Sequence, residues 1–269
     1  MKDIKFFIDT GDEDYIKTIW ESFLSKGLSG REVVGITTNP NAMSKCNIHN
    51  IVDFEKKTYN LCKLVSNIRN DNKGVVYVQH PDSNVSVDSL KKWIDLILTF
   101  SDGNTKVGLK IPPYQHLLEL VEEYQGKIDF NVTGVADCST ALMSFTYSPR
   151  YVSLIPGRME EKGIDAVSQM KFIDQRKNRF NYELITGSMR TVEGLLSAIQ
   201  GNTVPTIGTR VFDILKTKNI DEFIKLWSIT LELQSIKFSP HIDQRMTDLS
   251  VDFFKQMDSM GEQLKNNLS

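Results

Sequence analysis

The sequence predicts an α/β fold, a (β/α)8 TIM barrel with additional C-terminal helices. Three observations lead to this prediction. Eight short apolar runs rich in β-branched and aromatic residues recur along the chain, segments with helical spacing separate them, and a length of 269 residues is typical of one such barrel. Short apolar runs bounded by turn residues are typical of strands covered on both faces, and their alternation with helices favours a parallel sheet.

The expected strands are, in order, Lys5–Asp9, Val33–Thr37, Val75–Gln79, Val107–Ile111, Asp129–Thr133, Tyr151–Ile155, Glu183–Thr186 and Thr203–Ile207. Eight strand–helix units favour a closed barrel, and an open doubly wound sheet is the alternative. The chain has no GxGxxG after its first strand and no GxxxxGK[ST]. Dinucleotide-binding and P-loop interpretations therefore lose their main support.

The segment Gln115–Tyr124 illustrates the helical pattern between strands. Its apolar residues share one face, its glutamates share another, and Gly126 is the expected C-cap. From about residue 216 the pattern is helical to the end, with expected helices Ile220–Leu233 and Asp248–Leu268 and a break at Phe238–His241. We expect one domain over residues 1–269, with a helical extension over about 216–269.

The composition excludes several classes of protein. Hydrophobic residues make up 40%, charged residues 25%, and the net charge is −2, which offers no basic surface for nucleic acid. Charges interrupt the N-terminus before a signal-peptide core can form, and no apolar stretch approaches the roughly 20 residues of a membrane span. The three cysteines and four histidines show no metal-ligand spacing. We expect a cytoplasmic protein that binds no nucleic acid, membrane, metal or cofactor.

Lys110 is the most informative residue of the chain. It lies within the apolar run Val107–Ile111, directly before Pro112 and Pro113. Burial disfavours the charged form of an amine and can lower its pKa by several units. A neutral lysine is a nucleophile that can form a Schiff base with a carbonyl substrate. The alternative is a solvated lysine where the strand frays.

Polar residues also end most of the other expected strands. In a barrel, the C-terminal ends of the strands form one rim, where active sites lie. The residues expected there are Asp9, Thr37, Asn39, Gln79, Lys110, Asn131, Thr133, Ser153, Arg158, Ser188 and Arg190. Asp9 and Asn39 could instead cap the helices that follow them. Ser188 and Arg190 precede the expected helix Thr191–Gln200, which Gly201 ends, and together with Arg158 they could hold a phosphate; two structural salt bridges are the alternative.

Six motifs with this order and spacing resemble the transaldolase family, including its short members and the related fructose-6-phosphate aldolases. The resemblance extends from Phe6 to about Leu215, and a weaker similarity is found at Asp252–Gln263. The motifs are Ile8-Asp9-Thr10-Gly11-Asp12, Gly35-Ile36-Thr37-Thr38-Asn39-Pro40, Leu109-Lys110-Ile111-Pro112, Asn131-Val132-Thr133, Tyr151-Val152-Ser153 with Gly157-Arg158, and Gly187-Ser188-Met189-Arg190.

The resemblance implies a role for each matching residue. Lys110 would attack the ketose C2 carbonyl, and Asp9 would handle the hydroxyl proton at the bond being cleaved. Asn39 and Ser153 would hold the dihydroxyacetone end, with Asn131 in the same pocket. Thr133 would position a catalytic water, and Thr37 would line the site beside it. Arg158, Ser188 and Arg190 would bind the phosphate group of the substrate as a clamp.

The chain departs from the family at three places. Transaldolases have a glutamate where this chain has Gln79. The fructose-6-phosphate aldolases have a glutamine there, as this chain does. Those aldolases pair it with a tyrosine at the position of Ile155, and transaldolases have phenylalanine at that position. Gly208–Arg210 replaces the usual proline-containing turn. The chain also has extra residues around 20–31 and 216–247.

The expected function is transfer of a dihydroxyacetone unit from a ketose phosphate, such as fructose 6-phosphate or sedoheptulose 7-phosphate, to an aldose phosphate. One alternative is an aldolase that releases dihydroxyacetone, which Gln79 favours and Ile155 disfavours. Another is a specialised or noncanonical relative that acts on an unusual sugar in a biosynthetic pathway, and a third is a catalytically lapsed relative that binds a sugar phosphate or a biosynthetic partner. The intact Lys110, Asp9 and Asn39 argue against loss of the chemistry. The expected partners are sugar-phosphate substrates and further copies of the chain in a homo-oligomer.

Overall fold

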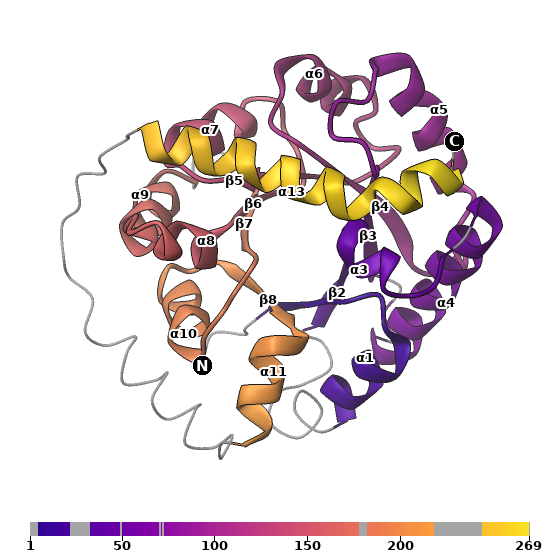
Figure 1. The fold of residues 1–269 in the computed structure, drawn as a ribbon, viewed down its shortest axis with the longest axis horizontal. Helices are drawn as coiled ribbons and strands as arrows, with labels where there is room; N and C mark the ends of the chain where they lie inside the picture. The colour runs from indigo at the N-terminus through magenta and orange to yellow at the C-terminus, as the bar shows by residue number, and fades with distance from the viewer. Residues whose placement is uncertain are drawn as a thin grey trace.

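The computed structural model describes residues 5–21, 33–48, 50–69, 71, 73–177, 182–217 and 244–268. Eight parallel strands close into one barrel in sequence order, from β1 to β8 (Figure 1). Their bounds are β1 Phe6–Asp9, β2 Val33–Thr37, β3 Val75–Gln79, β4 Lys106–Ile111, β5 Phe130–Val135, β6 Tyr151–Leu154, β7 Glu183–Thr186 and β8 Val204–Gly208. The predicted barrel is confirmed, each strand end lying within two residues of its expected place, and the open sheet is wrong.

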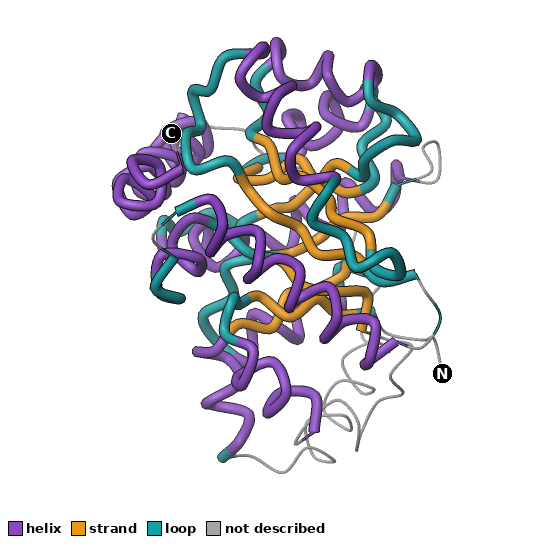
Figure 2. Tube along the Cα trace, turned by 90° about the vertical axis from the view of Figure 1, so that its right-hand side faces the viewer, coloured by secondary structure: helices purple, strands orange, loops and turns teal. Residues whose placement is uncertain are grey.

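Helices surround the strands on their outer side, as Figure 2 shows. They are α1 Glu13–Ile19, α3 Pro40–Ser44, α4 Ile51–Arg69, α5 Val87–Leu98, α6 Gln115–Glu123, α7 Cys138–Phe145, α8 Pro156–Glu161, α9 Ala166–Lys177, α10 Val192–Gln200, α11 Thr209–Lys216 and α13 Gln244–Leu268. The expected helix Gln115–Tyr124 is confirmed as α6, and Gly126 beyond it has a φ of 80°. The expected helix Ile220–Leu233, the break at Phe238–His241 and most of the extra segment 20–31 lie outside the described residues.

On the inner face of the barrel, the two-residue period of the strands places polar side chains above apolar ones. Phe7, Tyr77 and Tyr151 pack edge to face low in the barrel, with ring centroids 5.4 to 5.9 Å apart. Two residues further along the same strands come Asp9, Gln79 and Ser153. Because alternate residues of a strand share a face, these polar side chains lie directly above an apolar floor.

Gly108 of β4 makes room for this floor. A Cβ atom at Gly108 would lie 2.4 Å from the ring of Tyr77, well inside van der Waals contact. Lys110 follows Gly108 by two residues on the same face of the strand. The aromatic layer therefore excludes water from below the lysine, which is one source of its burial.

The C-terminal helix α13 lies across the mouth of the barrel, as the yellow ribbon in Figure 1 shows. It packs against α3, β5 and α8. Its residues Phe253, Phe254 and Met257 form an apolar cluster with Ile155 and others. None of the helices in the described ranges is long and apolar enough to cross a membrane.

Candidate active site

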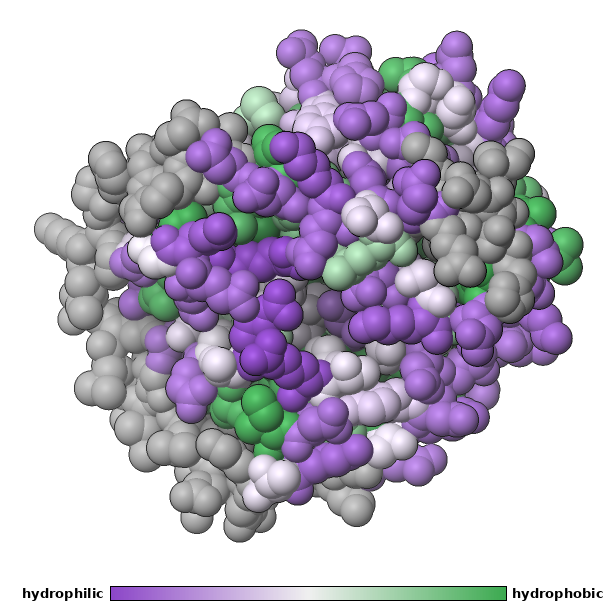
Figure 3. All heavy atoms as spheres, in the orientation of Figure 1, coloured by the Kyte–Doolittle hydropathy of each residue, from purple (hydrophilic) through white to green (hydrophobic). Residues whose placement is uncertain are grey.

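A cavity of about 330 Å³ lies at the C-terminal mouth of the barrel. The space-filling view of this face is largely hydrophilic around its hollow centre (Figure 3). Nine of the eleven residues that the sequence predicts for the site line the cavity: Asp9, Thr37, Asn39, Lys110, Thr133, Ser153, Arg158, Ser188 and Arg190. The other two, Gln79 and Asn131, are buried beside it and flank Lys110 in the strand register.

Lys110 is buried in the body of β4, with 8% of its surface exposed. The reading of a solvated lysine at a frayed strand end is therefore wrong. Its Nζ donates a hydrogen bond to the carbonyl oxygen of Thr38 at 3.0 Å. Burial lowers the pKa of Lys110, and the Asp9 carboxylate partly opposes this shift. The arrangement produces an amine that loses its proton more easily than a surface lysine.

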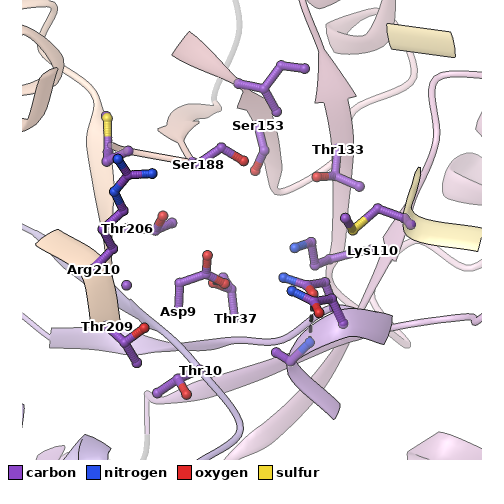
Figure 4. A pocket seen from close by; sticks show the side chains of 18 of the residues that line it. Asp9, Thr10, Thr37, Lys110, Thr133, Ser153, Ser188, Thr206, Thr209 and Arg210 are labelled. Carbon is purple, nitrogen blue, oxygen red and sulfur yellow. Dashed lines mark hydrogen bonds between the residues drawn. The ribbon is translucent and has the colours of Figure 1, made fainter. Parts of the chain in front are cut away.

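Asp9 faces Lys110 from the far side of the cavity, as Figure 4 shows. Thr37 donates a hydrogen bond from Oγ1 to Oδ1 of Asp9 at 2.8 Å and fixes the carboxylate. The alternative of a helix cap is wrong for Asp9, because Asp12 caps α1 by accepting from the backbone N–H groups of Asp14 and Tyr15. The Asp9 carboxylate is thus available to a bound molecule.

Asn39 does cap a helix, as the alternative reading held. Its Oδ1 accepts from the backbone N–H of Ala42 at 2.9 Å, at the start of α3. The cap uses the side-chain oxygen and orients the amide, so that its NH2 group can still donate to a ligand in the cavity. Capping and ligand binding are compatible in this residue.

Two buried amides beside Lys110 have unused hydrogen-bonding groups. Ser153 donates from Oγ to Oδ1 of Asn131 at 2.7 Å, but Nδ2 of Asn131 has no partner in the described part of the chain. Oε1 of Gln79 is also buried without a partner there. A buried unpaired polar group costs about 1–3 kcal/mol, so such groups usually meet a water or a ligand.

Arg158 and Arg190 lie together at the rim beyond β6 and β7. Burial and then the adjacent Arg190 guanidinium lower the pKa of Arg158, while Glu161 opposes the shift. Arg158 donates to Oε1 of Gln256 in α13, and its guanidinium lies 5.0 Å from the ring centre of Phe253. Two neighbouring guanidinium groups repel each other unless an anion lies between them.

One of these two arginines, Arg190, forms a salt bridge. Nε of Arg190 lies 3.3 Å from a carboxylate oxygen of Glu161, which is exposed. Within the residues that the structure describes, Arg158 forms no salt bridge. The alternative of two structural salt bridges is therefore wrong for Arg158, and a positive charge is left over for an anionic ligand.

The first turn of helix α8, which follows β6, packs directly on Ser188. A Cβ atom at Gly157 would lie 2.0 Å from the Ser188 carbonyl oxygen. Ser188 itself has a φ of 56°, in the left-handed region that is unfavourable for residues other than glycine. Such backbone strain is often found at ligand sites. The close approach brings Arg158, Ser188 and Arg190 into one cluster.

We predict that Gly157→Ala weakens the binding of phosphorylated ligands at least tenfold and destabilises the fold by about 1–3 kcal/mol. The new methyl group must push the start of α8 away from the backbone of Ser188. Gly187→Ala is the matched control, since its nearest neighbour to an added Cβ lies 3.7 Å away. Thermal unfolding and calorimetric titration with a sugar phosphate measure both effects. Equal changes of ligand affinity and of unfolding temperature in the two variants would contradict the prediction.

Sequence reasoning missed several residues of the cavity, among them Thr206 of β8, Thr209 and Arg210 at the start of α11, and Phe253 and Met257 of α13. Thr206 and Arg210 follow the polar strand-end rule and could have been found by applying it to the eighth strand. Phe253 and Met257 had no such signal, because they belong to the C-terminal helix and follow no strand of the barrel directly.

The fold and site define a (β/α)8-barrel protein with a buried lysine in the lining of its cavity. No protein-family profile matches the chain. Curated relatives from Desulfotalea psychrophila and Syntrophobacter fumaroxidans, each named a probable transaldolase, are 26% and 28% identical to it. The matches cover 83% of this chain and 98% and 96% of theirs. The resemblance to the transaldolase family is thus confirmed.

Solved structures support the fold alone. The thiamine phosphate pyrophosphorylase of Pyrococcus furiosus has a TM-score of 0.51 with 11% sequence identity, and the alignment covers 85% of this chain and 97% of that one. At this identity the likeness concerns the arrangement of strands and helices.

Proposed function

We propose that the protein is a transaldolase, which transfers a dihydroxyacetone unit from a ketose phosphate to an aldose phosphate through a Schiff base on Lys110. The observation that carries this proposal is a buried lysine of lowered pKa facing the Asp9 carboxylate across the cavity. A retro-aldol cleavage needs both an electron sink and a base near the departing hydroxyl proton. The iminium formed on Lys110 is the sink, and Asp9 is the base.

The first half-reaction breaks the donor sugar. The neutral Lys110 amine attacks C2 of the ketose, and the hydroxyl group formed at C2 takes up a proton from solvent and leaves as water, which gives the iminium. Asp9 accepts the proton of the C4 hydroxyl, the C3–C4 bond breaks, and its electron pair neutralises the iminium to an enamine. The aldose phosphate leaves, while Arg158, Ser188 and Arg190 bind its phosphate through charge-assisted contacts.

The second half-reaction builds the product. An acceptor aldose phosphate binds in the same clamp, and the enamine carbon attacks its aldehyde. Asp9 returns its proton to the new hydroxyl group, and water then hydrolyses the iminium and frees Lys110. Thr133 lines the cavity, and the unpaired groups of Gln79 and Asn131 flank Lys110. These three side chains are suited to hold the water that enters and leaves.

Cleavage with release of dihydroxyacetone is the second candidate. Gln79 favours it by resemblance, whereas Ile155 lacks the hydroxyl group that such aldolases have at this position. Ile155 is buried in the apolar cluster with Phe253 and Phe254. Since its side chain offers no proton, we rank transfer ahead of release.

One experiment separates these candidates. The protein is incubated with fructose 6-phosphate, with and without erythrose 4-phosphate, and free dihydroxyacetone and transfer product are measured. Borohydride reduction followed by intact mass and peptide mapping is expected to give a three-carbon adduct on Lys110. Release faster than transfer would establish the aldolase, and no adduct would contradict both candidates.

We predict that Gln79→Glu increases the ratio of transfer to release and adds an ionisation to the pH–rate profile, because glutamate can exchange a proton with the bound water and glutamine cannot. Gln79→Met is the control, as it has a similar length without hydrogen-bonding groups. If Gln79 has only a structural role, Gln79→Glu will change stability and total activity while the ratio stays constant.

A further inference from the structure

A third guanidinium group, that of Arg210, lies at the same cavity. Arg210 is the second residue of α11 and lines the cavity with an exposed side chain. In Figure 4 it extends along the wall near Ser188 and Thr206, on the side opposite Lys110. None of the steps proposed above uses this residue.

Among the described residues, no acidic side chain compensates the charge of Arg210. In the described part of the chain, no carboxylate forms a salt bridge with Arg210. Asp213, one turn further along α11, accepts a hydrogen bond from the Tyr15 hydroxyl and lies 3.7 Å from Nζ of Lys216. The acidic group nearest in sequence is therefore already engaged.

Arg210 follows a different strand from Arg158 and Arg190. The clamp follows β6 and β7, whereas Arg210 follows β8, whose Gly208 pairs with Asp9 of β1. In a closed barrel of eight strands, β8 lies diametrically opposite β4, the strand of Lys110. A molecule bound at Lys110 therefore has guanidinium groups beyond three strands, β6, β7 and β8, for its anionic groups to contact.

We propose that Arg210 binds a second anionic group of the substrate, and that the substrates are therefore sugar phosphates with a further carboxylate or phosphate. This inference rests on the proposed function. A guanidinium group binds either anion through two parallel hydrogen bonds, and a charge-assisted contact of this kind changes affinity on the order of tenfold to a hundredfold. Arg210 is thus a specificity-determining residue.

The test uses polyol ligands without a carbonyl group, which cannot react with Lys110. Calorimetric titration compares glucitol 6-phosphate with 6-phosphogluconate and with glucitol 1,6-bisphosphate, which add a carboxylate and a phosphate. Erythritol 4-phosphate and 4-phosphoerythronate repeat the comparison at a shorter spacing. The second anion is expected to lower Kd at least tenfold in one of the pairs, and the pair that shows it identifies the anion and its distance from the first phosphate.

The variant Arg210→Gln is expected to remove this preference while the Kd of the monophosphate polyols changes less than about threefold. Arg190→Gln, the matched control, should weaken every ligand of the series to a similar extent. A uniform loss in Arg210→Gln would make Arg210 a third member of the clamp and overturn the proposal. The absence of any preference in the wild-type protein would overturn it as well.

The same preparations distinguish failure of this inference from failure of the proposed function. Borohydride trapping of fructose 6-phosphate on Lys110 reports the Schiff base and does not depend on a second anion. Trapping without a preference rejects only the role of Arg210. If the preference for a second anion disappears in Arg210→Gln but borohydride traps nothing on Lys110, the anion site is supported and the transaldolase chemistry is rejected.

Discussion

Lys110→Met is expected to abolish turnover and borohydride trapping, with activity falling below the detection limit of a coupled assay. Methionine has a similar length and no nucleophilic nitrogen, so no covalent intermediate can form. The fold should persist, because an apolar side chain replaces a buried amine at a position with only 8% exposure. Mass spectrometry after reduction, together with thermal unfolding, measures both results.

The same substitution tests the lowered pKa. Between its folded pKa and the ordinary value of 10.5, Lys110 binds a proton in the unfolded chain and not in the folded one. Its contribution to the free energy of unfolding therefore rises with pH through that window. Lys110→Met should remove this part of the pH dependence and leave stability at neutral pH equal or higher.

Lys106→Met is the matched control for both measurements. Lys106 begins the same strand, but its side chain is 70% exposed and lies 3.7 Å from Asp129. An exposed ion pair of this kind contributes little to stability. We expect nearly unchanged trapping and unfolding in Lys106→Met; normal trapping in Lys110→Met would instead reject the Schiff-base assignment.

Asp9→Asn is expected to reduce kcat about 10²- to 10⁴-fold while borohydride trapping of the ketose on Lys110 persists. Lys110 can still form the iminium, but the variant lacks the base that accepts the C4 hydroxyl proton. Trapping should also reach half its maximum at a lower pH, because the Asp9 carboxylate raises the pKa of Lys110 and the amide does not.

The control for Asp9→Asn is Asp12→Asn, the same chemical change three residues away in the lining of the same cavity. Asp12 caps α1, and asparagine is an equally good cap. Asp12→Asn should therefore keep the fold and most of the activity. Loss of trapping in Asp9→Asn, or equal losses of activity in the two variants, would contradict the role assigned to Asp9.

The strands could be predicted because their signal is local. Each run contains its own β-branched and aromatic residues and its own turn residues, so strand positions emerge without knowledge of the neighbours. The polar residues at their ends followed from the same pattern. Lys110 is the clearest case: the apolar residues around it indicated burial, and burial alone accounts for the direction of its pKa shift.

Capping could be predicted only in part. Asp9 and Asn39 both end a strand and precede a helix, and both residue types are good caps. Asn39 adjoins Pro40 at the first turn of α3 and caps it, whereas the Thr10–Gly11 segment delays the start of α1 until after Asp12. Sequence reasoning could not separate these cases, because the outcome depends on where the backbone of each loop turns.

The sequence by itself determined the barrel class, the order of its strands and the inward row of polar residues that includes Lys110 and Asp9. Only the tertiary structure decided that α13 lies over the β4–β6 side of the mouth, that Gln79 and Asn131 keep groups without a partner among the described residues, and that Arg210 lies across the cavity from the lysine. The physical reason is the range of the interactions. Periodicity and apolar runs act within a few residues of the chain, whereas a cavity forms between residues that only the closure of the barrel brings together.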